Sequence, residues 1–221
     1  MRGVFDIIGP VMIGPSSSHT AGAVRLGRIA GKILGEEPAS ARIRLHGSFA
    51  KTYRGHGTDK ALLAGILGFS TDDARIKDAL EIAAARGVAH VFLPDDLGEN
   101  AHPNTVEIAL TGKSGRSTTV VGASVGGGNI LVNRIDGFDV EMTGRYYTLA
   151  TVHEDRPGVI MGVTQVLARQ AINVAFMRVS RKTRGAQALM ILEVDDEITD
   201  AVAKEIVSVC GVTNSFCIPP V

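Results

Sequence analysis

The chain has 221 residues, of which 45% are hydrophobic and 21% are charged, so it can bury a core as ordinary globular proteins do. Its 23 Lys and Arg residues balance its 23 Asp and Glu residues, so we expect neither nucleic acid nor an anionic membrane as its main partner. Residues 1–10 lack the apolar core of a secretory signal, and no segment has the roughly 18 apolar residues of a membrane helix. Two cysteines are too few for a disulfide scaffold. We therefore expect a cytoplasmic protein.

The first predicted elements flank a polar turn. Residues 1–19 are expected to form an entry strand or loop with Val11-Met12-Ile13 as its apolar part, and apolar periodicity predicts a helix over residues 20–34. The turn itself reads Gly14-Pro15-Ser16-Ser17-Ser18-His19-Thr20. Ser and Thr before such a helix act as caps, and the same geometry presents hydroxyl and backbone N–H groups to an anion. The spacing alone is compatible with a capped turn and with an anion or carboxylate site.

A second polar turn stands at a second predicted helix start. Residues 41–49 alternate apolar and polar side chains as a half-buried strand does, and residues 60–69 form an apolar helix. Between them lies Arg54-Gly55-His56-Gly57-Thr58-Asp59, in which Thr58 or Asp59 is expected to cap the helix. Two turns that combine hydroxyl and imidazole groups favour a functional site over a chance arrangement.

The middle of the chain predicts one more helix, over residues 74–86, and strands over residues 89–93, 105–111 and 118–124. The run from Gly122 to Asn129 lacks the G-x-G-x-x-G spacing and has strands on both sides, so a dinucleotide site is not expected. A hairpin turn or a close backbone approach explains it.

The character of the chain changes near Gly144, and we place a domain boundary between residues 1–144 and residues 145–221. The second part predicts strands and helices in the order βαββαβ, over residues 146–153, 159–170, 174–181, 187–194, 199–209 and 213–218. That order gives a ferredoxin-like sheet with both helices on one face, and the fold class of the whole chain is α+β.

The turn Asp155-Arg156-Pro157-Gly158 stands between the first strand and the first helix of this second part. With the βαββαβ order it resembles the ACT domain, a module that binds amino acids and regulates metabolic enzymes. The resemblance implies that Gly158 lets a ligand carboxylate approach the helix N-terminus, because glycine has no side chain to obstruct the backbone donors. A plain helix start with proline in its first turn explains the same residues.

Three segments of the first 143 residues form an unusual set: the run from Phe5 to Gly22, Gly55-His56-Gly57-Thr58-Asp59, and the run from Ser124 to Ile130. Together they resemble the beta chain of the iron–sulfur-dependent L-serine dehydratases, in the form with separate alpha and beta chains. The resemblance implies a mixed-sheet α/β-type domain related to the allosteric substrate-binding domain of some phosphoglycerate dehydrogenases. It also implies elimination of water from L-serine to aminoacrylate, which then yields pyruvate and ammonia, with a [4Fe-4S] cluster and without pyridoxal phosphate.

The resemblance further implies that this chain is half of an enzyme. Cluster binding requires several cysteine thiolates, whereas the chain has only Cys210 and Cys217, both in the ACT-like part. We therefore expect no metal ligand here and expect the cluster on a separate alpha chain, with the two cysteines structural or incidental. The implied partners are that alpha subunit, the substrate L-serine and, through the ACT domains, a second beta chain.

The same resemblance suggests roles for individual residues. His56 is expected to abstract the α-proton, because an accessible imidazole titrates near neutrality; alternatively it only orients Asp59 or caps the helix. His19 is the second expected catalytic residue; a helix-cap hydrogen bond is the alternative role, and the two roles can coexist. Substrate binding is expected of Ser16, Ser18, Thr20, Thr58 and Asn129, and effector binding of Gly158. The remaining histidines have no motif around them and are expected at the surface or in the core: His46, His90, His102 and His153.

Two other functions fit the same residues. A regulatory module could hold an effector anion at the Ser-rich helix start without chemistry, and a freestanding sensor could bind an amino acid at the ACT site alone. A neighbouring gene for a cysteine-rich alpha-type chain would favour the enzyme.

Overall fold

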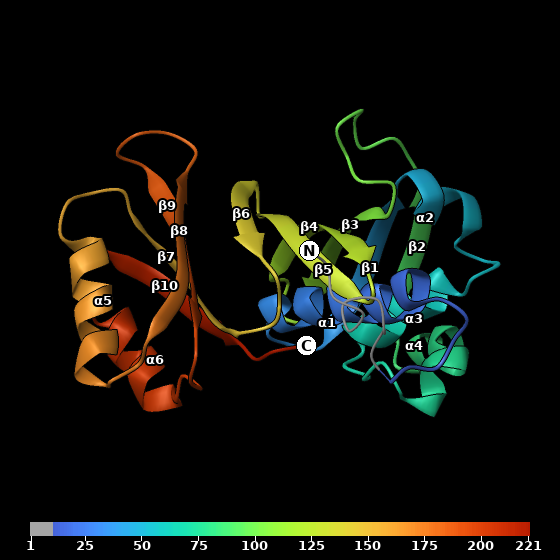
Figure 1. The fold of residues 1–221 in the computed structure, drawn as a ribbon, viewed down its shortest axis with the longest axis horizontal. Helices are drawn as coiled ribbons and strands as arrows, with labels where there is room; N and C mark the ends of the chain where they lie inside the picture. The colour runs from blue at the N-terminus through green and yellow to red at the C-terminus, as the bar shows by residue number, and fades with distance from the viewer. Residues whose placement is uncertain (1–10) are drawn as a thin grey trace. The chain divides into compact units, whose positions relative to one another are not determined.

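The computed structural model describes residues 11–221, which fold into two compact units (Figure 1). One unit extends to Asp136 and the other runs from Gly137 to Pro220. The α+β class is confirmed. The boundary after residue 144, inferred from the change in sequence pattern, stays a prediction. No helix within residues 11–221 is long and apolar enough to cross a membrane.

The N-terminal unit is a mixed sheet with its helices gathered around one long amphipathic helix. The sheet has the strand order β2-β1-β3-β4-β5-β6, with β6 (Phe138–Met142) at its edge. In it β1 and β2 are parallel, while β1–β3, β3–β4 and β4–β5 are antiparallel. Its elements are the π-helix η2 (Ser17–Gly22), α1 (Ala23–Leu34), β1 (Pro38–Leu45), α2 (Gly47–Thr52), α3 (Thr58–Ile66), the 3-10 helix η3 (Ala74–Asp78), α4 (Ala79–Ala85), β2 (Ala89–Pro94), β3 (Thr105–Gly112), β4 (Ser117–Gly126) and β5 (Asn129–Ile135).

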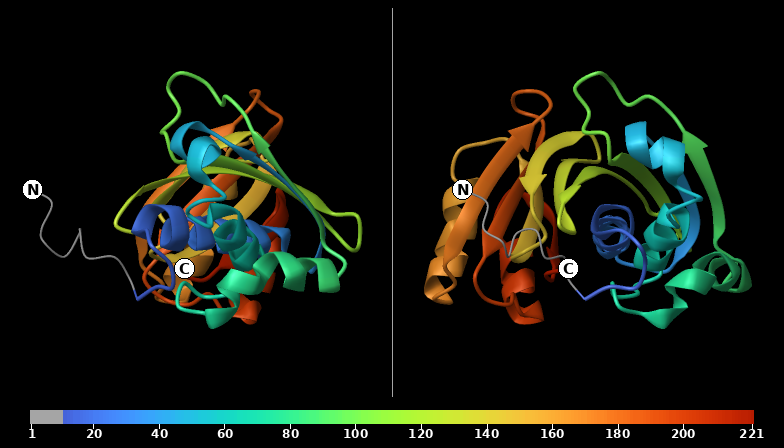
Figure 2. Two further views of the ribbon diagram at one scale, coloured as in Figure 1. Left: turned by 90° about the vertical axis from the view of Figure 1, so that its right-hand side faces the viewer. Right: turned by 45° about the vertical axis from the view of Figure 1, so that its right-hand side comes forward.

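Glycine lets α1 and α3 pack backbone against backbone. A Cβ on Gly27 would lie 2.2 Å from the Leu62 carbonyl oxygen, and one on Gly65 would lie 2.0 Å from the Val24 carbonyl oxygen. The apolar face of α1 packs against the sheet, which curves around this helix (Figure 2). The two polar turns are therefore carried by two helices that are fixed to one another.

Several predicted elements differ from the structure in extent. The strand predicted to Phe49 ends at Leu45 and is followed by α2, because Gly47 adopts φ +56° and any Cβ there would lie 2.7 Å from the Pro103 carbonyl oxygen. The helix predicted from residue 20 begins at Ser17 with a π-turn. The predicted helix over residues 74–86 is divided into η3 and α4.

The start of the chain also departs from its prediction. Val11 and Ile13 form no strand, because each is held by Thr71: the Thr71 hydroxyl donates to the Val11 carbonyl and the Ile13 N–H donates to the Thr71 carbonyl. The rest of the predicted entry segment, residues 1–10, lies outside the described residues.

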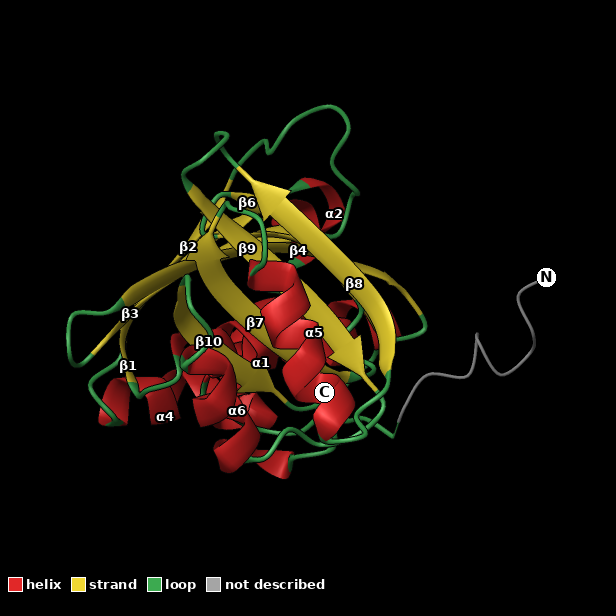
Figure 3. Cartoon of the chain, turned by 90° about the vertical axis from the view of Figure 1, so that its left-hand side faces the viewer, coloured by secondary structure: helices red, strands yellow, loops and turns green. Residues whose placement is uncertain are grey.

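The C-terminal unit has the predicted βαββαβ order. The strand that comes before it in the chain, β6, was not predicted and belongs to the six-stranded sheet. Its four-stranded antiparallel sheet has the order β10-β7-β9-β8, and both helices cover one face (Figure 3). Leu149, Met190 and Leu192 of that face pack against Val163 and Ile206 of the helices. The elements are β7 (Tyr147–Glu154), α5 (Val159–Arg169), β8 (Val174–Arg181), β9 (Gln187–Val194), α6 (Asp200–Val207) and β10 (Val212–Ile218).

Candidate active site

The Ser-rich turn is a helix cap that ends in a buried imidazole. Ser16 has extended backbone and its Oγ accepts a hydrogen bond from the His19 N–H at 3.1 Å, while its carbonyl accepts from the Thr20 N–H at 2.8 Å. The π-helix then buries His19 and Thr20 and leaves Ser16 and Ser18 half-buried. The capping interpretation is therefore correct, and it places hydroxyls and an imidazole together at one helix start.

Both ring nitrogens of His19 have neighbours. Nδ1 lies 3.4 Å from Ser16 Oγ, and Nε2 lies 3.1 Å from Ser48 Oγ. The ring also contacts Phe49 edge to face, with centroids 5.2 Å apart. Burial, and then the nearby charge of His56, lower the pKa of His19 below its usual value. His19 is thus held neutral and in one orientation.

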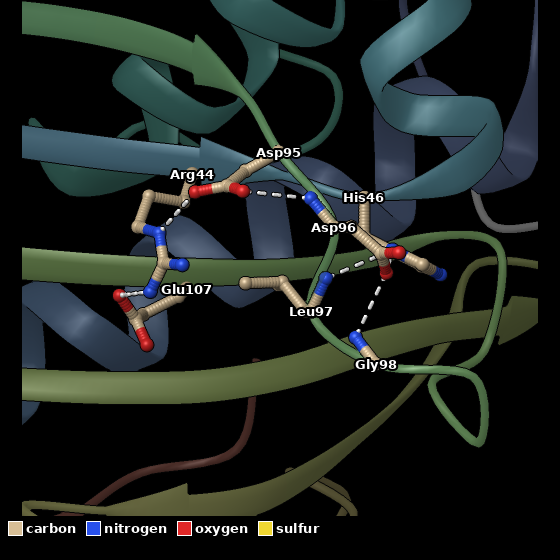
Figure 4. Close-up of polar contacts among 7 residues, drawn as sticks. All are labelled: Arg44, His46, Asp95, Asp96, Leu97, Gly98 and Glu107. Carbon is tan, nitrogen blue, oxygen red and sulfur yellow. Dashed lines mark hydrogen bonds and ion pairs between the residues drawn. The ribbon is translucent and has the colours of Figure 1, made fainter.

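Ser48 was not among the predicted site residues, because the sequence pattern extended the preceding strand through it. Its position depends on the end of β1, where His46 Nδ1 accepts a hydrogen bond from the Leu97 N–H at 3.1 Å. Beside this bond, Arg44 bridges Asp95 and Glu107 at 2.7 Å and 2.8 Å, which ties the segment after β2 to β1 (Figure 4). His46 therefore has a structural partner, and the network fixes the point from which α2 carries Ser48 to His19.

The second polar turn brings His56 against His19. The two rings meet edge to face with centroids 4.8 Å apart. His56 is exposed, and neither of its ring nitrogens has a hydrogen-bond partner among residues 11–221. Two motifs that are distant in sequence thus form one site, in which only His56 has a free imidazole.

Three buried hydroxyls near these turns lack partners. Thr20 Oγ1, Thr58 Oγ1 and Ser124 Oγ are buried and make no hydrogen bond to any described residue. Thr58 and Asp59 do not cap α3 as predicted: the N-cap is Gly57 in the left-handed conformation, with no side-chain hydrogen bond. Buried hydroxyls normally find partners, so these three are suited to a polar ligand.

Glycines bring two of these hydroxyls close to the chain around the turn. A Cβ on Gly14 would lie 2.7 Å from Thr20 Oγ1, and one on Gly22 would lie 2.1 Å from Ser124 Oγ. Ser124 begins the third sequence motif, but the sequence predicts no role for it. Only its unpartnered hydroxyl against the π-helix identifies it as a site residue.

The glycine run after Ser124 is the hairpin turn between β4 and β5. Asn129 Nδ2 donates to the Gly126 carbonyl at 3.1 Å, and Arg25 of α1 donates to the Gly128 carbonyl at 2.7 Å. The turn is therefore attached to the helix that follows the Ser-rich cap. Substrate binding by Asn129 stays a prediction.

The C-terminal unit has an open helix start at Gly158 and an unsatisfied imidazole nitrogen on the preceding strand, β7. Gly158 has φ +92°, caps α5 and would meet nothing within 4 Å if it carried a Cβ. His153, on the strand that leads to this turn, is 2% exposed; its Nδ1 lies 2.7 Å from the Glu154 carbonyl and its Nε2 has no partner. No sequence motif surrounds His153, and only its burial with an unpartnered Nε2 makes it a candidate ligand contact.

The donor atoms of this chain do not fit an iron–sulfur cluster. Cys210 and Cys217 are both free, and burial raises the pKa of the Cys217 thiol, which opposes thiolate formation. No group of three or more His, Cys, Asp or Glu side chains within residues 11–221 is arranged to hold a metal ion.

Comparisons with known proteins agree with the two units. Residues 3–135 match the family model "Serine dehydratase beta chain", and residues 147–211 match "ACT domain". The chain is 47% identical to the probable L-serine dehydratase, beta chain, of Bacillus subtilis (strain 168) and 37% identical to the L-serine dehydratase, beta chain, of Peptoniphilus asaccharolyticus, in each case over 93% of this chain and 92% of the relative.

A more distant relative is the D-3-phosphoglycerate dehydrogenase of Synechocystis sp., which is 26% identical over 89% of this chain but only 35% of its own length. The two beta chains, by contrast, match over nearly their whole length. With the matching family model and the clustered turns, they show that this chain belongs to the serine dehydratase beta chain family and carries a C-terminal ACT domain.

Proposed function

We propose that this chain is the beta subunit of an L-serine dehydratase, an ammonia-lyase that is active only with a separate alpha subunit. The observation that carries the proposal is the free imidazole of His56 beside the fully engaged His19, with three unpartnered hydroxyls nearby. A general base needs a free nitrogen, and a zwitterionic substrate needs hydrogen-bond partners that the fold has left unused.

His56 accepts the α-proton of L-serine in this proposal. The Cα proton passes to His56, and the β-hydroxyl takes up a proton from solvent and leaves as water, which gives 2-aminoacrylate. His56 then releases its proton to solvent. Its imine tautomer then takes up water and yields pyruvate and ammonia. Both ring nitrogens of His19 already have partners, so we assign it a positioning role beside His56 in place of the catalytic role expected from the sequence.

The substrate is bound by Ser16, Ser18, Thr20 and Thr58, with Asn129 at the glycine turn. We add Ser124 to this set because its hydroxyl is buried and unpartnered. Carboxylate binding at the Ser-rich turn is favourable because that turn presents hydroxyls and backbone N–H groups at a helix start.

A [4Fe-4S] cluster on the alpha chain would polarise the leaving hydroxyl as a Lewis acid, in place of pyridoxal phosphate. This chain supplies the proton acceptor and the carboxylate contacts. The free thiols of Cys210 and Cys217 agree with a reducing cytoplasm.

The ACT domain is proposed to pair two beta chains and to bind L-serine as an effector at Gly158. The open space at this glycine supports a ligand there. A purely regulatory module is the second candidate function, favoured by the similarity to part of a D-3-phosphoglycerate dehydrogenase.

Anaerobic co-expression with a cysteine-rich alpha chain tests the proposal. The isolated chain should contain no iron and form no pyruvate from L-serine, whereas the complex should contain iron and form pyruvate. Pyruvate formation by the iron-free isolated chain would contradict the proposal, and an iron-loaded complex without turnover would favour the regulatory module.

A further inference from the structure

The N-terminal unit contains a cavity whose lining includes none of the residues of the His19–His56 site. Its volume is about 620 Å³, and it lies among the end of α1, the loop before β1, the end of α3, the residues after α4 and the β3–β4 turn. Small-molecule sites have volumes of roughly 300–1,000 Å³, so this one could hold an organic ligand.

Basic side chains from several elements line this cavity. Arg28 and Lys32 are separated by one turn of α1, Arg86 caps α4, and Lys113 belongs to the β3–β4 turn. The apolar part of the wall comes from Pro38, Ile66, Leu67 and Val88. The chain as a whole has no net charge, so this concentration of cations is local.

The two acidic groups of the wall are already occupied. Glu37 pairs with Lys113 at 2.5 Å, and Glu36 accepts hydrogen bonds from the Ser114 hydroxyl and N–H at 2.5 Å and 2.9 Å. The pKa of both carboxyls is lowered, first by these hydrogen bonds. Both carboxylates therefore stay charged at neutral pH, and Glu37 also interacts with the charge of Arg86. The four basic side chains of the wall still outnumber these two carboxylates, so the wall carries a net positive charge.

Arg28 and Lys32 have no ion pair or hydrogen bond to any residue from 11 to 221 through their side chains, and Arg86 lies over the Phe69 ring at 5.8 Å. The partial negative charge at the C-terminus of α1 explains why a lysine is favourable at position 32, in the last turn of this helix. The helix dipole does not explain why Arg28 and Arg86, which lie on separate elements, both line this cavity.

We propose that this cavity binds a small, multiply charged organic anion of the phosphate or polycarboxylate type. The guanidinium groups of Arg28 and Arg86 offer paired N–H donors that match either kind of oxyanion, and Lys32 adds a point charge. The proposal does not depend on the dehydratase reaction.

Calorimetry and thermal unfolding of the isolated full chain test this site without the alpha subunit. The probes are pyrophosphate, adenosine monophosphate and citrate, each compared with sodium chloride at equal ionic strength. We expect at least one probe to raise the melting temperature beyond the chloride control. Response to the two phosphates alone assigns a phosphate ligand, and response to citrate alone assigns a polycarboxylate.

Matched variants locate the binding. Arg28→Gln/Lys32→Gln should weaken binding by at least about tenfold, because two charge-assisted contacts are lost. Arg42→Gln/Lys77→Gln removes the same charge from exposed residues outside the cavity and should change binding by less than about twofold. Arg86→Gln gives an independent variant if the first pair folds poorly. Failure of all three probes, or equal losses in the two double variants, would overturn the proposal.

Discussion

His19 and His56 lie edge to face, with ring centroids 4.8 Å apart and ring planes at 89°. One ring is buried and bonded through both nitrogens, and the other is exposed and free. Burial and, after it, the neighbouring imidazole of His56 lower the pKa of His19, so His19 is the neutral member of this contact.

The buried His19 should make the fold sensitive to acid. Its folded-state pKa lies below the unfolded value of 6.5, mainly through burial. As pH falls from 6.5 through the lowered pKa, the unfolded chain binds the proton first, so the free energy of unfolding decreases; above 6.5 the contribution is complete. We expect the melting temperature to fall between about pH 7.5 and about pH 5.5, and to fall less for His19→Gln. Equal slopes in both proteins would show that another group is responsible.

Thr58→Val should separate stability from activity. The Thr58 hydroxyl is buried without a partner, so its removal should leave the free energy of unfolding unchanged or raise it by up to about 1 kcal/mol. In the complex with the alpha chain, the KM for L-serine should rise by about tenfold, because one substrate contact is lost.

Thr118→Val is the matched control for this change. Thr118 is also buried, but its hydroxyl donates to Asp136 at 3.0 Å. This variant should lose about 1–2 kcal/mol of stability and keep its KM. A Thr58→Val protein that unfolds like Thr118→Val, with an unchanged KM, would make Thr58 a structural residue.

Gly158→Val should abolish serine binding at the ACT site. Isothermal calorimetry of L-serine with the isolated chain should lose the heat from this site, because a side chain would occupy the open space beside α5. Gly185→Val introduces the same side chain at φ +78°, also with nothing within 4 Å, and should retain the heat. If both variants bind L-serine as the unmodified chain does, Gly158 is only a helix start.

The sequence patterns predicted the elements more reliably than their contacts. The βαββαβ order of the second unit follows from regular periodicity, and the Ser16 cap follows from the chemistry of the turn. The helix α2 was not predicted because its first residues continue the apolar–polar alternation of β1. The strand ends there because Gly47 packs closely against Pro103, which is distant in sequence.

The sequence supplied candidate residues for the site but not their arrangement. His19 and His56 were both named, yet their contact depends on the packing of α1 on α3, which periodicity does not determine. The structure adds three candidate residues to those predicted. Ser48 is identified by its hydrogen bond to His19, and Ser124 and His153 by buried side-chain atoms without partners.

The proposed base can be tested directly by His56→Ala in the complex with the alpha chain. His56 is exposed and makes no side-chain hydrogen bond to the described residues, so co-purification and iron content should be unchanged. His90→Ala, which removes an imidazole bonded only to the nearby Val88 carbonyl, serves as the control. We predict that kcat for pyruvate formation falls by about 10²–10⁴-fold in His56→Ala and stays near the unmodified value in His90→Ala. A His56→Ala complex that retains most of its kcat would show that His56 is not the base.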